Sequence, residues 1–592
     1  MRLPRSLPRC WRNQIILLVV VLACAVCACA SAYNSRPKLV VIIVIDQFRG
    51  DYLERYHDQF GDGGFKLFLD RGAYFTDCNY DYANTRTAPG HATLLTGSYT
   101  SGHGIVANEW WDPQKKKRVT SVEDDTTKLV GIEPDVRAAQ TELGRGVSHD
   151  TPGASPHNLM GDTLGDELKL ATGGKARVFA VSLKDRAAVL PAGFSGDGAY
   201  WIDAKSGDWI TSTYYRPDLP DWVRNFNAPQ PGEGRAKKYW NREWKDSDGT
   251  TLGSTAPRNS NSKDGVPAGF YEVVGSTPFA NDYQFEFARE LVLYEKLGAG
   301  PSTDLLVISL SANDILGHQV GPDSPQMRGM ALALDRQLAE FFDFLRHQIG
   351  MASVWMALSA DHGVAPLPDF AKTLRLPAAN LDTKALREQI NSLLSKKYSK
   401  KADYVVDLDY PLAWLNEEAY NGLLAADSAS KKESDAETDA GEAMKQVGLA
   451  GYFTKSQLAR GDTPATEIGR RYAHSYSPEG GWYVIGIPRP FQVGSAHGTD
   501  HATPFSYDTH VPLAFYGLAF QPGVYRTHAE PVDLAVTLAS LLGINAPAQA
   551  TGRVLIEALA PPHHSTASPT PSSNDPSYAP PTSHPAPAGG TQ

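Results

Sequence analysis

Three short apolar runs constrain the fold of this chain more than any other feature of its sequence. They span Leu39–Ile45, Leu305–Leu310 and Val354–Leu358, and polar residues follow each of them. A continuous run of apolar, β-branched residues is typical of a strand buried on both faces, as in a parallel sheet covered by helices. Ligands of such sheets bind beyond the carboxyl ends of the strands, so we expect the polar residues that follow to share one site.

Helical patterns lie between these runs. At Asn281–Leu297 and Gln326–His347, apolar residues recur at spacings of three and four residues. This alternation predicts an α/β domain in which a mostly parallel sheet is flanked by helices on both faces. A chain of 592 residues, 42% of them apolar and 21% charged, is globular and long enough for one large domain with insertions or for two domains.

Two long stretches break the alternation. Residues from about 190 to 275 are rich in Trp, Tyr, Gly, Pro and Asn, and those from about 366 to 490 mix short strands with the charged tract Asp427–Glu442. We expect both to be insertions that form a cap near the active site of a domain covering residues 33–560. The tail, residues 561–592, has almost no large apolar residues and is expected to be disordered.

The first 32 residues have the pattern of a secretory signal peptide. Several arginines precede an apolar run at Ile15–Val26, and the small residues Ala30–Ala32 follow it. We expect cleavage after about Ala32 and export to the periplasm or the extracellular medium, with no membrane span left. Two alternatives stay open: an uncleaved anchor, although the run is shorter than the roughly 20 residues of a span, and lipid attachment at a cysteine between residues 24 and 29.

Cleavage would change the cysteine count and the charge of the chain. It would leave only Cys78 of the five cysteines, so no intramolecular disulfide could form despite export. It would also remove four arginines and no acidic residue, which takes the formal charge from −10 to about −14. Such an acidic chain is not expected to bind nucleic acid through a basic face. The sequence does not indicate an oligomeric state.

Four polar segments offer metal ligands. Asp46 follows the first run, Asp314 and His318 follow the second at a spacing of one helical turn, and Asp361-His362-Gly363 follows the third. The fourth segment is the histidine-rich stretch 496–504. Each segment alone is as often a helix cap or a surface turn as a ligand. Aspartates after three buried strands make coincidence improbable.

The residue types indicate the metal. Carboxylate oxygens and imidazole nitrogens suit Zn²⁺, and a chain without usable cysteines excludes thiolate sites. Three aspartates and at least three histidines are enough for two metal ions with three protein ligands each. Two divalent ions, roughly 4 Å apart, are a known arrangement for in-line phosphoryl displacement.

The segment Asn84–Gly97 predicts a turn that leads into a short helix, with Thr87 near the N-cap and Pro89 in the first turn. A threonine there most often caps the helix with its hydroxyl. The alternative is that free backbone N–H groups and the helix dipole hold a phosphoryl group at Thr87, and that a neighbouring metal activates the hydroxyl as a nucleophile.

Together these segments resemble alkaline phosphatases of the PafA type, within the alkaline phosphatase superfamily. The resemblance runs from about residue 37 to residue 517 and rests on separate motifs in the same order. They are Val44-Ile45-Asp46-Gln47-Phe48-Arg49, Thr87-Ala88-Pro89-Gly90-His91, His103-Gly104-Ile105-Val106-Ala107-Asn108, Lys184-Asp185-Arg186, Asp314 with His318, Asp361-His362-Gly363 and Tyr507-Asp508-Thr509-His510-Val511-Pro512. The resemblance implies the alkaline-phosphatase-like fold with cap insertions.

The resemblance also implies the metal ligands. Asp46, Asp361 and His362 would hold the zinc that activates Thr87, whereas Asp314, His318 and His501 would hold the zinc that faces the leaving group. His501 is chosen because the family places this ligand nine residues before the histidine of its Asp-Thr-His-Val-Pro segment, here His510. His497 is the rival, because it precedes the glycine usual after this ligand, whereas Ala502 follows His501.

Three further residues would contact the phosphate by the same resemblance: Asn108, Lys184 and Arg186. A monoester dianion has more charge to satisfy than a diester, and a lysine beside a bidentate arginine would favour it. The alternative is an exposed charged turn, which the apolar neighbours of Lys184-Asp185-Arg186 disfavour.

Relatives within the superfamily set the alternatives. A sulfatase needs a modified Cys or Ser with Pro at the second following position and Arg at the fourth, whereas this chain has Thr87, Pro89 and His91. Phosphodiesterases and nucleotide pyrophosphatases lack the Lys and Arg clamp, and an inactive binding protein should have lost part of the site. The resemblance therefore implies a secreted phosphate monoester hydrolase with two zinc ions and a phosphothreonine intermediate at Thr87.

Overall fold

One large sheet organises the chain in the computed structural model, which describes residues 36–132, 152–230, 233–234, 238–256, 269–424 and 428–560. The predicted signal peptide, 1–32, and the predicted disordered tail, 561–592, lie outside these residues. Within the described ranges the sheet has eleven strands. Their order across the sheet is β23 (Gly523–Tyr525), β2 (Ala73–Phe75), β22 (Leu513–Tyr516), β15 (Val354–Ser359), β1 (Leu39–Ile45), β14 (Asp304–Leu310), β7 (Val178–Ser182), β8 (Gly198–Ile202), β9 (Trp209–Ser212), β5 (Glu123–Val130) and β6 (Pro152–Ala154).

The three predicted strands form the centre of this sheet. β1 pairs in parallel with β14 on one side and β15 on the other, with Leu39 opposite both Asp304 and Val354. Every residue of these three strands is buried, as their continuous apolar sequences predict. Their carboxyl ends therefore lie side by side at one edge. Antiparallel pairs occur toward both margins, at β22 with β15 and at β9 with β8.

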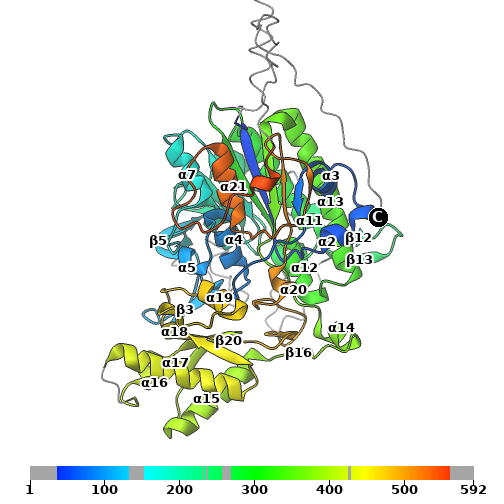
Figure 1. Cartoon of the computed structure of the whole chain (residues 1–592). Helices are drawn as coiled ribbons and strands as arrows, with labels where there is room; N and C mark the ends of the chain where they lie inside the picture. Colours follow the sequence, from blue (N-terminus) through cyan, green and yellow to red (C-terminus); the bar gives the residue numbers. More distant parts are fainter. Residues whose placement is uncertain are drawn as a thin grey trace, which may run out of the picture. The chain divides into compact units, whose positions relative to one another are not determined.

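Helices cover both faces of the sheet, which confirms the predicted α/β class (Figure 1). On one side, α11 (Pro278–Tyr294) packs against α13 (Pro325–Gln348). On the other, α4 (Thr87–Thr96) packs against α8 (Asp185–Ala192) and α21 (Asp533–Leu542). The two predicted helices begin and end within three residues of the expected bounds. Both start at a proline in the first turn, where the missing N–H has no intrahelical partner to lose.

Part of the first predicted insertion, about 190–275, belongs to the main sheet. β8 and β9 lie within it and extend the main sheet. Its aromatic residues are core residues, because Trp209 stacks on Phe287 of α11 with ring centroids 4.0 Å apart and Trp222 packs on the same ring. The aromatic composition therefore reflects a buried face against a helix, and the expectation of a cap over this whole range was wrong.

The second predicted insertion, about 366–490, has a sheet and a core of its own. Its strands are β17 (Val405–Asp409), β18 (Leu412–Leu415), β20 (Tyr483–Ile487) and β19 (Gly451–Thr454), in that order. The helices α15 (Thr383–Tyr398) and α17 (Ala429–Gln446) pack on them (Figure 1). The charged tract noted in the sequence forms α17, whose small residues Ala436, Ala440 and Ala443 are buried.

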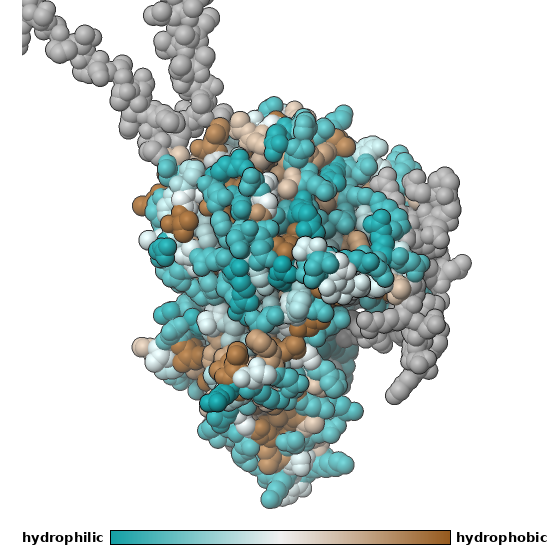
Figure 2. Space-filling view, turned by 90° about the vertical axis from the view of Figure 1, so that its right-hand side faces the viewer, coloured by the Kyte–Doolittle hydropathy of each residue, from teal (hydrophilic) through white to brown (hydrophobic). Residues whose placement is uncertain are grey.

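The surface is mostly hydrophilic on the face shown in Figure 2, where hydrophobic residues gather in separate patches. Among the described ranges, no helix combines the length and the apolar composition needed to cross a bilayer.

Candidate active site

The carboxyl edge of the central strands carries the three predicted aspartates. Asp46 directly follows β1, and Asp361 follows β15 after one intervening residue. Asp314 lies in the first turn of α12 (Ala312–Val320), which begins just after β14. Because the three strands are parallel neighbours, their ends bring Asp46 together with carboxylates that are more than 260 residues away in sequence.

Asp46, Asp361 and His362 form what we call the first ligand group. The Nε2 atom of His362 lies 3.5 Å from Asp46 Oδ1 and 3.7 Å from Asp361 Oδ2. All three side chains are fully buried, and these three atoms have no hydrogen-bond partner. A buried polar atom without a partner is costly. Three such atoms from one set of Asp and His residues fit a bound metal ion, which would satisfy all three.

Asp314, His318 and His501 form the second ligand group. Their ligand atoms all lie within 4.8 Å of one another, as do those of the first group. His318 lies one turn after Asp314 on α12, with its Nε2 atom 3.1 Å from Asp314 Oδ1. His501 Nε2 is 4.0 Å from the same oxygen. The structure brings His501 to this group, whereas the His497 side chain is exposed.

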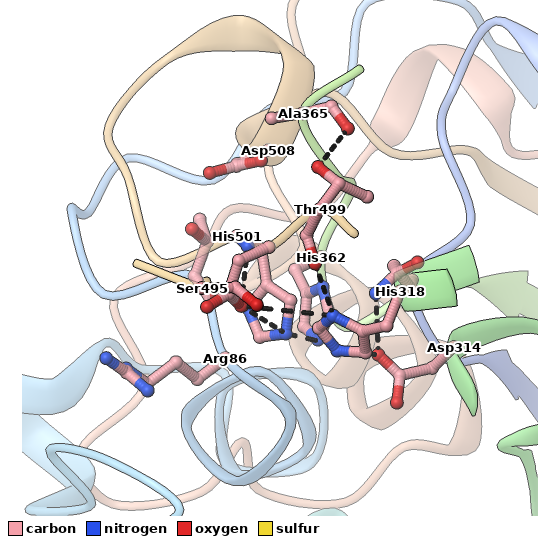
Figure 3. Close-up of polar contacts among 12 residues, drawn as sticks. Arg86, Asp314, His318, His362, Ala365, Ser495, Thr499, His501 and Asp508 are labelled. Carbon is pink, nitrogen blue, oxygen red and sulfur yellow. Dashed lines mark hydrogen bonds and ion pairs between the residues drawn. The ribbon is translucent and has the colours of Figure 1, made fainter. Parts of the chain in front are cut away.

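Hydrogen bonds to the backbone orient all three histidines. In each of them the Nδ1 atom donates to a backbone carbonyl, over 2.7 to 2.9 Å. His318 donates to Thr499, His362 to Gly363 and His501 to Thr85. A donating Nδ1 leaves Nε2 as the free lone pair, which is the usual way in which proteins orient metal-binding histidines. Figure 3 shows the imidazole rings side by side, and the rings of His362 and His501 stack at 3.8 Å. The two groups are therefore adjacent.

Lys184 lies between the two groups. Its Nζ atom is 2.6 Å from Asp46 Oδ2 and 2.6 Å from Asp314 Oδ2. Burial and the carboxylates of Asp314 and Asp361 raise the pKa of Asp46 well above its usual value, and Lys184 works against this shift. Burial alone would lower the pKa of Lys184, but Asp314 and Asp46 raise it above its usual value. Asp46, Asp314 and Asp361 are buried close together, so their ionised forms require positive charge at this site.

Thr87 is the first residue of α4 and is buried. Arg86 is the N-cap residue, and the α4 N-terminus has no side-chain capping hydrogen bond. The interpretation of Thr87 as a helix cap is therefore wrong, because Thr87 lies one residue inside the helix. A Cβ atom at Gly90 would overlap the Asp361 carbonyl oxygen, so the first turn of α4 packs directly on the first ligand group.

His91 ties this turn to the same group. One ring nitrogen, Nδ1, lies 2.8 Å from the Thr87 carbonyl oxygen and 3.3 Å from Asp361 Oδ2, while Nε2 lies 2.7 Å from Ser309 Oγ. Thr87 is thus held on the side of the first group.

The three predicted phosphate contacts lie beside α4 or at the start of α8, the helix that packs against it. Asn108 Oδ1 accepts the N–H of Ala88 at 2.8 Å, which places its amide beside Thr87. Lys184 is the N-cap residue of α8, and Arg186 lies in the first turn of that helix. The Lys184 side chain is 4% exposed, so this segment is no exposed charged turn. The Nε atom of Arg186 is buried without a partner.

Two residues that sequence-based prediction did not single out lie beside the ligand groups or the start of α4. Gln47 hydrogen-bonds Asp361 and Asp314, one from each ligand group. Arg86 forms an ion pair with Asp409 at 2.8 Å and donates to the Tyr410 carbonyl, which joins the start of α4 to the second insertion. Figure 3 shows the Arg86 side chain leading away from the histidines. Nothing in the local sequence indicates these distant partners.

A separate cavity of about 740 Å³ lies near the site. Its walls include Arg49, Phe370, Tyr507 and His510, and none of the six ligand residues lines it. Its two arginines pair with aspartates of the same walls, as Arg49 does with Asp51 at 2.9 Å. Three buried atoms without partners belong to the first ligand group, so we take the ligand groups, and not this cavity, as the candidate active site.

Comparison with known proteins agrees with this architecture. Residues 40–455 match the family described as type I phosphodiesterase / nucleotide pyrophosphatase. A Myroides odoratus protein named calcium-transporting ATPase is 33% identical over 90% of this chain and 96% of its own length. Alkaline phosphatase PhoV of Synechococcus elongatus is 30% identical over 92% of this chain and its full length.

Alkaline phosphatase PafA of Elizabethkingia meningoseptica is 32% identical over 88% of this chain and 95% of its own. A PafA crystal structure superposes with a TM-score of 0.73 at 29% identity, over 89% of this chain and 99% of PafA. Another PafA structure is of a variant substituted at one Thr, one Asn, one Lys and one Arg.

The chain therefore belongs to the alkaline phosphatase superfamily, as a member of the type I phosphodiesterase / nucleotide pyrophosphatase family and, within it, of the PafA-type alkaline phosphatases. It is an enzyme, an alkaline phosphatase. The resemblance inferred from the sequence motifs is confirmed.

Proposed function

We propose that this enzyme hydrolyses small phosphate monoesters at a site that holds two zinc ions, through a phosphothreonine intermediate at Thr87. One observation carries the proposal. Six Asp and His residues from three strand ends and one loop form two adjacent ligand groups, and the helix that begins at Thr87 packs against one of them.

The residues present fit two zinc ions. Asp46, Asp361 and His362 would hold one ion and Asp314, His318 and His501 the other, each with three ligands and room for an exchangeable fourth. Bound zinc would lower the pKa of a coordinated hydroxyl and neutralise charge on phosphate oxygens.

The protein's own residues would then direct the reaction. Thr87 Oγ1 loses its proton and attacks phosphorus, and the bond to the leaving oxygen breaks on the opposite face, because an in-line displacement needs both oxygens on one axis. The released alkoxide takes up a proton from water and leaves as the alcohol. The first ligand group adjoins α4, and by the resemblance to the PafA-type phosphatases the second group would face the leaving group. In the second step water attacks phosphorus and the Thr87–phosphate bond breaks. A proton of that water restores the Thr87 hydroxyl, and inorganic phosphate is released.

Asn108, Lys184 and Arg186 would hold the non-bridging phosphate oxygens in both steps. Asn108 is fixed by its bond to the Ala88 N–H, so its amide nitrogen is directed by the same helix that carries the nucleophile. A lysine and an arginine at the start of α8 supply two positive charges. Fixed donors aimed at developing charge stabilise a transition state strongly.

A second candidate is a phosphodiesterase or nucleotide pyrophosphatase, which the description of the matching family favours. The two charges of Lys184 and Arg186 favour the monoesterase, since a monoester carries the additional negative charge that they would neutralise. A catalytically inactive binding protein is the remote alternative, and the complete set of nucleophile, ligands and cations argues against it.

One comparison separates these functions. We expect kcat/KM for p-nitrophenyl phosphate to exceed that for bis-p-nitrophenyl phosphate, with two zinc ions per chain in the same preparation. Lys184→Ala should reduce monoester hydrolysis much more than diester hydrolysis, because the diester carries less negative charge for Lys184 to neutralise. A higher kcat/KM for the diester would support the second candidate, and no hydrolysis of either would support the third.

Secretion is part of the proposal. The signal peptide predicted at residues 1–32 would direct export to the periplasm or the extracellular medium. Both are oxidising, and the buried free thiol of Cys78 is compatible with that.

A further inference from the structure

Gln47 touches both ligand groups. Its backbone N–H donates to Asp361 Oδ1 at 3.0 Å, and its side-chain Nε2 donates to Asp314 Oδ1 at 2.8 Å. The residue is fully buried and lies directly after Asp46. One residue therefore links carboxylates that belong to different groups and to different strand ends.

The two hydrogen bonds select which carboxylate oxygens are free. Asp361 Oδ1 is taken by the Gln47 N–H, while Oδ2 faces His362 Nε2 without a partner. Asp314 is held on both oxygens, with Gln47 on Oδ1 and Lys184 on Oδ2. An oxygen that accepts one hydrogen bond keeps a second lone pair. Asp314 Oδ1, the atom nearest to His318 Nε2, can therefore bind a metal in a fixed orientation.

The backbone around Gln47 is built to hold this position. Gln47 has a φ of +62°, in the left-handed region that residues other than glycine seldom adopt. The Asn313 side chain donates to the carbonyls of Asp46 and Gln47 at 2.9 and 3.1 Å. Strain of this kind persists where surrounding contacts fix it, and it is concentrated at functional sites.

Gly317 makes room for the Gln47 amide. It lies on α12 between Asp314 and His318, where a Cβ atom would overlap Gln47 Oε1. Glycine is unfavourable within a helix by about 1 kcal/mol relative to alanine. The helix that carries two ligands therefore accepts this cost at the point where the Gln47 amide crosses it.

We propose that Gln47 is a positioning residue: it fixes the Asp314 carboxylate of the second ligand group against the Asp361 carboxylate of the first, and so sets the zinc affinity of the second group. This inference rests on the proposed two-zinc function. Groups that orient metal ligands typically contribute ten- to a hundredfold in metal affinity.

Two substitutions test this without removing a ligand. Gln47→Met keeps the side-chain length and removes the donor, and Gly317→Ala displaces the same amide while favouring the α12 helix. In competition with a chelator, each should raise the free zinc concentration for half-occupancy of the second site at least tenfold. Activity at low free zinc should fall in parallel and recover when zinc is added, which a general packing defect would not do.

Gln337→Met is the matched control. Gln337 is also buried and donates from Nε2 to a carboxylate, Asp282, at 2.7 Å, away from both ligand groups. It should lose stability but keep zinc affinity within twofold of the wild type. Wild-type zinc affinity in either folded test variant overturns the role of Gln47, and Gly317→Ala decides alone if Gln47→Met does not fold. A wild-type protein that neither binds zinc nor hydrolyses phosphate esters would instead contradict the proposed function.

Discussion

The ion pair between Arg86 and Asp409 should hold the second insertion to the start of the nucleophile helix. The Arg86 guanidinium lies 2.8 Å from Asp409 Oδ2 and donates to two backbone carbonyls, of Asp409 at 3.1 Å and of Tyr410 at 2.8 Å. The two side chains are 9% and 25% exposed. A hydrogen bond to a charged group is worth about 1.5–3 kcal/mol when it is shielded from water.

The chain offers a matched pair that differs in burial. Lys116 and Glu418 form another ion pair between the second insertion and the rest of the chain, at 2.7 Å, but their side chains are 64% and 71% exposed. Exposed pairs of this kind contribute roughly 0.2–1 kcal/mol. Burial alone should therefore separate the two coupling energies, because the distances are nearly equal.

Double-mutant cycles measured by urea unfolding test this. Arg86→Ala, Asp409→Ala and the double variant should give a coupling energy of about 1.5–3 kcal/mol, and the same cycle on Lys116 and Glu418 less than about 1 kcal/mol. Arg86→Ala should also lower kcat/KM more than Lys116→Ala does, because α4 begins at the next residue. A coupling energy for Arg86 and Asp409 no larger than that of the exposed pair would show that burial does not strengthen this ion pair.

Two further predictions concern stability. Burial raises the pKa of Glu437 to about 7, so its contribution to stability is present below its usual value of 4.5 and is lost as the pH rises through 7. The loss is about 3 kcal/mol at most, and Glu437→Gln should raise Tm at pH 8 but not at pH 4.5; parallel Tm profiles from pH 4.5 to 8 would contradict this. Ala502 is buried with a φ of +76°. Ala502→Gly should raise the free energy of unfolding by about 0.5–1 kcal/mol, since relief of left-handed strain exceeds the added chain entropy, and a decrease in urea unfolding would show that this strain is absent.

Much of the fold was predictable because burial on both faces leaves a direct mark on sequence. β1 coincides with its predicted range, and its neighbours differ from theirs by one residue. The stretch around Trp209 misled because aromatic residues fit a cap and a buried sheet face equally well, and only the contact with Phe287 distinguishes them. Composition alone does not show whether aromatic residues face the core or cover a site.

Some residues of the candidate site were predictable from the sequence and others were not. The aspartates follow from strand order, because parallel strands end at one edge. The choice between His497 and His501 depends on how a loop folds back onto Thr85, which spacing alone does not fix. Gln47 and Arg86 act through partners more than 260 residues away, so their contacts emerge only in the folded chain.

Ala502 is the one position at the late ligand where this chain departs from the family pattern. The family usually has glycine after this ligand, and the positive φ of Ala502 shows why, since the backbone there is in the left-handed region. The Ala502 N–H still donates to the Thr85 carbonyl at 3.1 Å, so the loop keeps the geometry that directs His501.

The role of Thr87 is tested most directly by the Thr87→Ala variant, with zinc content and p-nitrophenyl phosphate hydrolysis measured on one preparation. We expect two zinc ions per chain, as in the wild type, and a loss of most turnover, because the ligand groups stay intact while the nucleophile is gone. Turnover close to that of the wild type with two zinc ions bound would contradict the assignment of Thr87.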